Sequence, residues 1–232
     1  MDFDLIRNPS KNDIINRNIC DVLFMVDATG SMSSYIKSAI QNCSNIIERL
    51  NLFYNYEKRF KYGAIFYRDP IDCRDTDKHS FFPMTSNKNE FQNWIKTITA
   101  QGGGDLAEDW NGAYELALNQ MNWSSGNNNK IVVHIADSSA HGNEFNPPDF
   151  LDQHPEEGPK FIKTIEKIAN FGLKIIAFPI GDKSSFYSFK KFQEIYKLNN
   201  GYSFFLFPTN IMDVEYFNNI TEQTIKFIID YC

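Results

Sequence analysis

Apolar and polar residues are arranged along the chain so that strands and helices are predicted in turn. Each predicted strand is a short, mostly apolar run bounded by polar residues, which is typical of strands buried in a parallel sheet. These runs cover residues 21–26, 60–67, 131–136, 173–180 and 202–207. A shorter run, Ser80 to Phe82, predicts an edge strand, because Pro83 follows directly and proline cannot donate a ladder hydrogen bond.

Helices are predicted where apolar residues recur at steps of three, four and seven. After the first strand, Ile36, Cys43 and Leu50 are seven residues apart and fall on one face of a helix at 36–50. The same kind of spacing predicts further helices at 91–98, 110–121, 161–171, 188–198 and 214–228. The segment 138–159 has no such period and contains four prolines, so we predict a long loop, and loops of this length are often functional.

The alternation of strands and helices favours an α/β fold: a doubly wound, mostly parallel central sheet with helices on both faces. No linker or change in composition divides the chain after its first residues. We therefore expect a short leader at 1–18 and one domain at 19–232. In such sheets ligands bind beyond the carboxyl ends of the strands, so a site is expected at the loops after Val26, Ala100 and Ala136.

Composition narrows the class of protein. Hydrophobic residues make up 42% of the chain and charged residues 22%, which are values of a folded domain rather than a disordered chain. The net charge of −6 argues against the basic surface of a nucleic-acid binder and suits cations or basic partners better. No apolar run approaches the ~20 residues of a membrane-spanning helix, so no membrane span is expected.

The four cysteines, Cys20, Cys43, Cys73 and Cys232, lie far apart in the chain. Without a C-x-x-C pair, neither a zinc ribbon nor a thioredoxin-like centre is indicated. Cys20 adjoins a predicted strand and Cys43 falls on a helix stripe, so both are expected to pack in the core. The N-terminal segment lacks the apolar stretch of a secretion signal, so a reducing, cytoplasmic location is expected.

Oxygen-bearing side chains gather where two of the predicted strands end. Directly after the first strand, the sequence D-x-T-x-S places Asp27, Thr29 and Ser31 two residues apart, so in an extended segment they point to one side. Asp137 follows another strand, and Asp105 lies in the glycine-rich loop between the two. Carboxylates and hydroxyls without nitrogen or sulfur suit Mg²⁺ or Mn²⁺ better than Zn²⁺.

The residues around these positions resemble the von Willebrand factor A (vWA) domain family. Asp21–Met32, with its D-x-T-G-S-M sequence, is similar to the first motif of that family, and the resemblance continues through Gly102–Glu108 and Ile135–Gly142. The resemblance covers nearly the whole chain, from about Cys20 to Tyr231. The chain is most similar to intracellular members of the family, such as the A-type domains associated with alpha-kinases. The resemblance implies the same α/β sheet.

The resemblance also implies a metal-ion-dependent adhesion site (MIDAS), in which Asp27, Thr29, Ser31 and Asp137 hold Mg²⁺, with Mn²⁺ or Ca²⁺ as alternatives. The middle threonine of the family has no counterpart here, and Asp105 stands at or beside its position. A further carboxylate would neutralise the ion and weaken its attraction for an acidic partner. The implied function is a non-enzymatic module that binds a protein partner through the metal face, with the long loop shaping specificity.

Other interpretations of these residues remain open. Asp27 and Asp137 could each cap a helix, which is a common use of Asp near Ser or Thr in such turns. Acids at strand ends also serve Mg²⁺-dependent phosphohydrolases, although the second Asp that many aspartyl-phosphate enzymes carry is missing here. A third interpretation is a vWA scaffold domain that has lost its metal dependence.

Several other polar residues lie near the expected site. His134 falls within a buried strand and is expected in the core. His141 and His154 lie in the long loop, where they could form a second ion site or a partner surface, although solvated histidines are commoner in loops. Tyr67-Arg68-Asp69 ends a strand, and Arg68 could brace the site through a carboxylate or belong to an ordinary turn.

Overall fold

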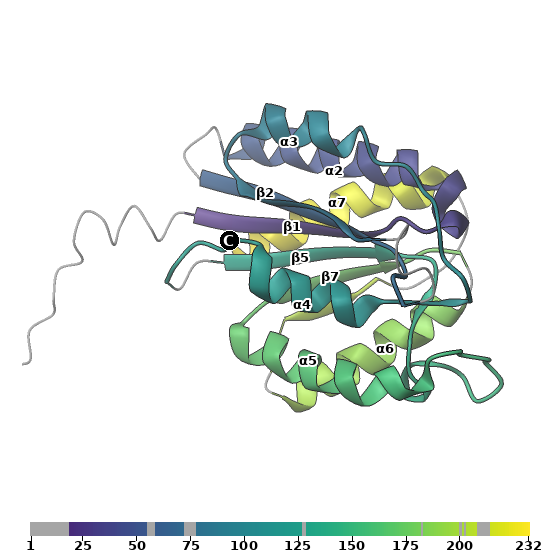
Figure 1. The fold of residues 1–232 in the computed structure, drawn as a ribbon. Coiled ribbons are helices and arrows are strands. Elements are labelled where there is room, and N and C mark those ends of the chain that lie inside the picture. The colour runs from purple at the N-terminus through teal and green to yellow at the C-terminus, as the bar shows by residue number, and fades with distance from the viewer. Residues whose placement is uncertain are drawn as a thin grey trace, which may run out of the picture.

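The fold is built on a six-stranded sheet with the strand order β3-β2-β1-β5-β7-β8 (Figure 1). The computed structural model describes residues 19–54, 59–71, 78–126, 129–181, 183–199, 201, 203–207 and 214–232. The strands of this sheet are β1 (Ile19–Asp27), β2 (Arg59–Tyr67), β3 (Ser80–Thr85), β5 (Asn129–Ala136), β7 (Lys174–Pro179) and β8 (Phe204–Leu206). Every neighbouring pair is parallel except β2 and β3. The predicted α/β class is therefore confirmed.

Helices cover both faces of this sheet, as the alternating pattern predicted (Figure 1). The helices are α2 (Ile36–Phe53), α3 (Lys88–Ile95), α4 (Trp110–Gln120), α5 (Gly158–Phe171), α6 (Lys183–Leu198) and α7 (Val214–Tyr231). Along β1, Phe24 packs into the core that contains α2, α3 and α7, while Met25 packs into the core that contains α4, α5 and α6. A strand buried on both faces has no polar positions to alternate with, which is why β1 reads as one apolar run.

The edge strand β3 is longer than its sequence suggested. It pairs antiparallel with β2 and continues through Pro83 to Thr85, with a register shift between Tyr62 and Ala64. An edge strand tolerates proline because one row of its backbone groups has no ladder partner. The following helix α3 begins at Lys88 rather than at residue 91, because the side chain of Asn87 accepts the Glu90 amide and caps it there.

Two short segments for which no strand was predicted form a second, two-stranded sheet. β4 (Ala107–Glu108) pairs parallel with β6 (Ser139–Ala140), with Glu108 opposite Ala140. Two-residue strands are too short to show a periodicity, so apolar spacing could not predict them. The predicted loop 138–159 also contains two 3₁₀ helices, Asn143–Phe145 and Pro155–Glu157. This small sheet holds the glycine-rich loop against the long loop at the carboxyl end of the main sheet.

The cysteines differ from expectation at one position. Cys20 and Cys43 are both buried, as predicted. Cys20 also forms a disulfide with Cys232, which directly follows α7. The pairing spans 212 residues, and only the fold brings the start of β1 beside the C-terminus. Cys73, the leader 1–18 and the first residue of the predicted strand at 202 lie outside the described residues.

His134 is a core residue, as its position in a buried strand predicted. Its ring is fully buried on β5, and its two nitrogens contact the hydroxyls of Tyr67 and Tyr114 at 3.0 and 3.1 Å. Burial lowers the pKa of His134 well below its ordinary value, so the ring is neutral. A neutral ring has one donor and one acceptor nitrogen, so one tyrosine accepts a hydrogen bond from it and the other donates one.

Within the described part of the chain, every helix is too short or too polar to cross a lipid bilayer.

Candidate metal centre

The candidate site lies at the carboxyl end of the main sheet, where β1 and β5 run side by side. Val26 pairs with Ile135 in parallel register, so Asp27 and Asp137 leave the sheet at the same edge. The amide of Ala28 donates to the carbonyl of Tyr67, and the amide of Gln101 donates to the carbonyl of Ala28, both at 2.9 Å. These backbone bonds hold the first motif between β2 and the glycine-rich loop.

A chain of hydrogen bonds connects four of the five residues predicted to hold a metal. Asp27 Oδ1 accepts from the amide of Thr29 at 2.9 Å and from its hydroxyl at 2.6 Å. The hydroxyls of Thr29 and Ser31 are 3.2 Å apart, and the Ser31 hydroxyl donates to Asp137 Oδ1 at 3.0 Å. The N-cap residue of α2 is Tyr35, with no capping side chain, so Asp27 does not cap that helix.

The glycine-rich loop lies directly over this motif. Gly30 donates its amide to the carbonyl of Gly102 at 2.8 Å, and a Cβ at Gly30 would lie 3.1 Å from that oxygen. Gly103 has a φ of +84°, and a Cβ there would lie 3.1 Å from Glu108 Oε1 and 3.3 Å from the Cβ of Thr29. Glycine is therefore required here by conformation and by close approach.

Glu108 is the acid that the glycine-rich loop brings to the first motif, and sequence reasoning missed it. Its side chain is buried on β4, close enough to Thr29 and Asp27 for both to shift its pKa. Asp105 has different contacts: its two carboxylate oxygens accept from the amides of Ala107 and Gln153 at 3.0 and 3.2 Å. The nearest sequence signal is Asp109, the N-cap of α4, which marks the start of that helix but does not by itself place Glu108 in the site.

Burial and repulsion between carboxylates make the site electrostatically unfavourable for its own charges. Burial, followed by repulsion from Asp137, raises the pKa of Asp27 to about 8. Burial, followed by repulsion from Asp27 and Asp69, raises the pKa of Glu108 to about 11. Burial also raises the pKa of Asp137. A bound cation would remove this penalty by offsetting the negative charges.

Two buried oxygens at this site have no hydrogen-bond partner among the described residues: Asp27 Oδ2 and Glu108 Oε2. Buried polar atoms are almost always satisfied, so such a pair calls for an explanation. A divalent cation is a fitting one, because the surrounding donors are all carboxylate or hydroxyl oxygens. The residues present therefore fit the metal that the first motif implies.

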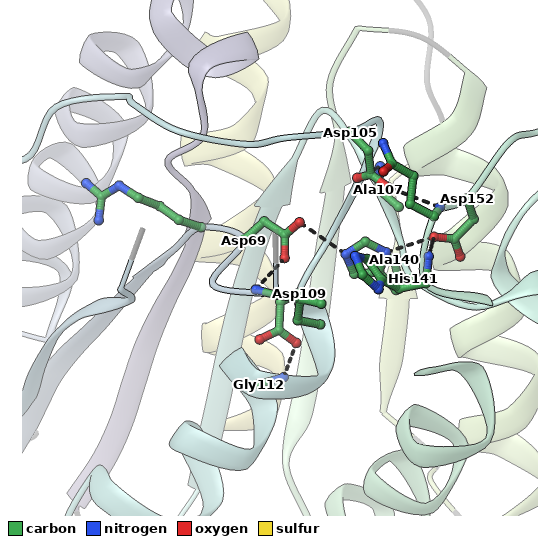
Figure 2. A network of polar contacts seen from close by, with 12 residues as sticks. Asp69, Asp105, Ala107, Asp109, Gly112, Ala140, His141 and Asp152 are labelled. Carbon is green, nitrogen blue, oxygen red and sulfur yellow. Dashed lines mark hydrogen bonds and ion pairs between the residues drawn. The ribbon is translucent and has the colours of Figure 1, made fainter. Parts of the chain in front are cut away.

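Figure 2 shows a second set of polar contacts, centred on His141 and the aspartates around it. His141 is buried, contrary to the expectation of a solvated loop histidine, because β6 carries it into the interior. Its Nε2 is 3.3 Å from Asp69 Oδ2, and its Nδ1 is 2.9 Å from Asp152 Oδ1. Burial alone lowers the pKa of His141, but hydrogen bonds with Asp69 and Asp152 outweigh it and raise the pKa to about 9.

Arg68 has a structural role at the end of β2. Its guanidinium donates to the carbonyls of Lys78 and Thr99 and to the hydroxyl of Ser80, at 3.0 to 3.1 Å. These bonds tie β2 to the start of β3 and to the segment after α3. Of the Tyr67-Arg68-Asp69 sequence, it is Asp69 that reaches toward the long loop, through His141.

Comparisons with known proteins agree with the fold. A sequence profile of the von Willebrand factor A domain matches residues 21–143. The chain is 34% identical over 143 residues to the alpha-protein kinase vwkA of Dictyostelium discoideum, covering 62% of this chain and 22% of the kinase. It is 30% identical over 129 residues to the putative ariadne-like RING finger protein R811 of Acanthamoeba polyphaga mimivirus, covering 54% of this chain and 12% of that protein. The chain thus spans less than a quarter of each relative.

Solved structures with the same fold include bacterial proteins of low sequence identity. The pilus adhesin SpaC of Lactobacillus rhamnosus GG superposes with a TM-score of 0.61 at 13% identity, over 92% of this chain and 30% of SpaC. The conserved hypothetical protein BatB of Bacteroides thetaiotaomicron gives a TM-score of 0.56 at 13% identity, over 91% of this chain and 98% of BatB. At this identity the likeness shows the fold alone.

The profile match covers more than half of the chain and includes both strand ends that build the site. Domains of this kind generally mediate protein interactions, which supports an interaction module at the general level. The sequence motifs, the sheet topology and the profile match together show that the chain belongs to the von Willebrand factor A domain family.

Proposed function

We propose that this domain is a divalent-metal-dependent protein-interaction module and that the metal face contacts the partner. The observation that carries the proposal is the pair of buried, unsatisfied carboxylate oxygens on Asp27 and Glu108. They lie in one cluster with the hydroxyls of Thr29 and Ser31 and the carboxylate of Asp137. Such a donor set favours Mg²⁺, with Mn²⁺ or Ca²⁺ as alternatives.

The charge of this cluster indicates what kind of group the partner offers. Asp27, Glu108 and Asp137 together bring up to three negative charges to one divalent ion. An ion surrounded by three carboxylates attracts a fourth only weakly. We therefore expect the partner to reach the metal with a neutral oxygen, such as a hydroxyl or a carbonyl, rather than with an Asp or Glu side chain.

The relatives suggest how such a module is used. An alpha-protein kinase and a putative RING finger protein each contain a segment similar to this chain. In this proposal the domain itself performs no catalysis and recruits protein partners in the cytoplasm, with no nucleic acid or membrane-spanning role. A disulfide such as Cys20–Cys232 persists best outside reducing compartments. The disulfide therefore argues against the cytoplasmic location, but not against the rest of the proposal.

Calorimetric titration of the 232-residue chain with Mg²⁺ and Mn²⁺ tests the metal. Asp27→Asn keeps the shape of the side chain and removes its charge, and we expect it to weaken binding at least about tenfold, which corresponds to ~1.4 kcal/mol. Ser31→Ala removes one hydroxyl donor. Its matched control is Ser33→Ala, because Ser31 and Ser33 are both exposed in the same 3₁₀ turn, Gly30–Ser34.

The pattern across these variants decides the outcome. The proposal requires binding by the wild type and Ser33→Ala, and weaker binding by Asp27→Asn and Ser31→Ala. Equal affinity in all four proteins would rule out a metal at this site. Turnover of a phosphate ester that Asp27→Asn abolishes would instead favour a phosphohydrolase.

A further inference from the structure

Beside the cluster formed by Asp27, Thr29, Ser31, Glu108 and Asp137 lies a second group of potential metal ligands, which includes a histidine nitrogen. Asp69 follows β2, Asp105 precedes β4 and His141 follows β6 (Figure 2). One carboxylate oxygen from each aspartate and one ring nitrogen of His141 all lie within 4.8 Å of one another. Three separate loops therefore converge on one point at the same end of the sheet.

From this convergence we infer a second metal site, formed by Asp69, Asp105 and His141, that takes a nitrogen-accepting divalent ion such as Zn²⁺. Imidazole nitrogen suits Zn²⁺, whereas an oxygen-only set suits Mg²⁺. Two ligands bound to one tetrahedral Zn²⁺ at 2.0–2.1 Å lie about 3.3 Å apart. The distance between His141 Nε2 and Asp69 Oδ2 is also 3.3 Å, so this pair needs little adjustment.

The ring of His141 is oriented as a metal ligand usually is. A ligating histidine almost always directs its other nitrogen to a carboxylate or carbonyl, which fixes the ring. Here Asp152 accepts from His141 Nδ1 at 2.9 Å, which turns Nε2 toward Asp69 and the shared point. Asp152 is itself held by the amides of Gly142 and His154. Asp152 is thus a positioning residue rather than a ligand.

Both aspartates are likewise held by backbone amides. Asp69 Oδ1 accepts from the amide of Ile71 at 3.2 Å, which turns Oδ2 toward His141. Asp105 accepts from the amide of Ala107 on one carboxylate oxygen and from the amide of Gln153 on the other. The donors are therefore fixed in place before an ion arrives.

A buried and unsatisfied carboxyl stands next to this group. Glu108 pairs with Ala140, the residue before His141, and its Oε2 has no hydrogen-bond partner among the described residues. Asp69 and Asp105 both repel Glu108, so excess negative charge extends from the first cluster into the second. A cation at the second site would offset charge that the first ion alone leaves uncompensated.

The alternative occupant of this group is a proton on His141, clamped between Asp69 and Asp152. Titration of the Asp27→Asn protein separates the two, because that variant impairs the first site and leaves the second intact. We expect it to bind one equivalent of Zn²⁺ by calorimetry. Co²⁺ should give the visible absorption of a tetrahedral complex, and added Zn²⁺ should bleach it.

Substitutions of Asp69, Asp105 or His141 should then remove the Zn²⁺ binding and the Co²⁺ absorption. Asp105→Asn is the decisive variant, because Asp105 is only half-buried and its replacement keeps the side-chain shape; circular dichroism checks that the variant is folded. We expect Asp105→Asn and His141→Gln to abolish the Co²⁺ spectrum. Asp152→Asn should weaken Zn²⁺ binding by about 10- to 100-fold. The exposed Asp149→Asn, an identical change in the same long loop, should have no effect.

The result that would overturn the second site is a folded Asp27→Asn protein, by circular dichroism, that binds no Zn²⁺. Zn²⁺ binding that survives both Asp105→Asn and His141→Gln would overturn it as well. The two sites fail independently in these measurements. Loss of Mg²⁺ binding in Asp27→Asn tests the first site, and loss of Zn²⁺ binding in Asp105→Asn with Mg²⁺ binding retained tests the second.

Discussion

At the scale of single residues, the site is a place where burial and charge oppose each other. Asp27 and Glu108 are buried beside each other, and an isolated buried carboxylate is costly unless it is paired, metal-bound or protonated. Without a metal, this cost is reduced when the carboxylates take up protons, which is why the pKa values of both groups are raised. In the proposed function, a proton and the metal ion therefore compete for the same oxygens.

This competition predicts the pH dependence of stability in the absence of metal. Folding raises the pKa of Asp27 from 3.8 to about 8, so the folded protein holds a proton that the unfolded chain releases near pH 4. The stability of the metal-free protein should therefore fall as the pH rises through this range. The raised pKa values of Glu108 and His141 act in the same direction.

Thermal denaturation in EDTA at pH 5 and pH 8 measures this effect. In Asp27→Asn the new side chain cannot titrate, so the melting temperature should fall less between the two pH values than it does in the wild type. Saturating Mg²⁺ should restore stability at pH 8 in the wild type, because the ion binds only the folded state. A wild-type melting temperature that rises from pH 5 to pH 8 in EDTA would contradict the assignment.

The hydroxyl of Tyr114 is predicted to stabilise the core through His134. Tyr114→Phe leaves His134 Nδ1 buried without its partner, which should lower the free energy of unfolding by about 1–3 kcal/mol. Urea denaturation followed by circular dichroism measures the change. Tyr231→Phe is the control, since Tyr231 is partly exposed, and it should change stability by less than about 0.5 kcal/mol.

At the scale of elements, the start of α4 sets the position of Glu108. Asp109 Oδ1 accepts from the amide of Gly112 at 2.6 Å and caps the helix, and Asp109 Oδ2 contacts His79 Nε2 at 3.2 Å. Glu108 is the residue immediately before this cap. A cap that frays would therefore release a proposed metal ligand as well as a helix end.

Asp109→Ala is predicted to destabilise the fold by about 1 kcal/mol and also to weaken Mg²⁺ binding. Asn87→Ala is the matched control, because Asn87 caps α3 in the same way, through the amide of Glu90. It should cost similar stability in urea denaturation and leave the calorimetric Mg²⁺ affinity unchanged. Equal Mg²⁺ affinities in both variants would show that the cap does not position Glu108.

Elements with a clear period were predictable, and those without one were not. The strands around Phe24 and His134 and the helices around them follow from apolar spacing, because burial on a sheet or helix face imposes that spacing. Asp27, Thr29, Ser31 and Asp137 were predictable for the same reason, since they flank periodic strands. Glu108 was not, because its position depends on the two-residue pairing of β4 with β6.

At the scale of the whole molecule, the Cys20–Cys232 disulfide links the start of the first strand to the end of the last helix. A bond across 212 residues restricts the unfolded chain strongly. Reduction is therefore predicted to lower the free energy of unfolding by about 2–4 kcal/mol. Spacing alone could not reveal this pair, because contact between the chain ends is a property of the folded sheet.

Denaturation with and without dithiothreitol checks this prediction. Cys232→Ser should be insensitive to dithiothreitol and about as stable as the reduced wild type. A wild type whose unfolding midpoint is unchanged by dithiothreitol would argue against the disulfide. In that case the expectation of a reducing location would stand.

The strand order has a consequence for how this domain can diverge. All five proposed ligands of the first site fall between Asp27 and Asp137, inside the matched segment 21–143. The later elements β7, β8 and α7 complete the sheet and its covering layer but contribute none of these proposed ligands. The proposed ligands and the supporting elements thus follow one another along the chain. A homologue could exchange the segment after Asp137 for an unrelated sequence of similar shape and still keep every side chain proposed to hold the ion.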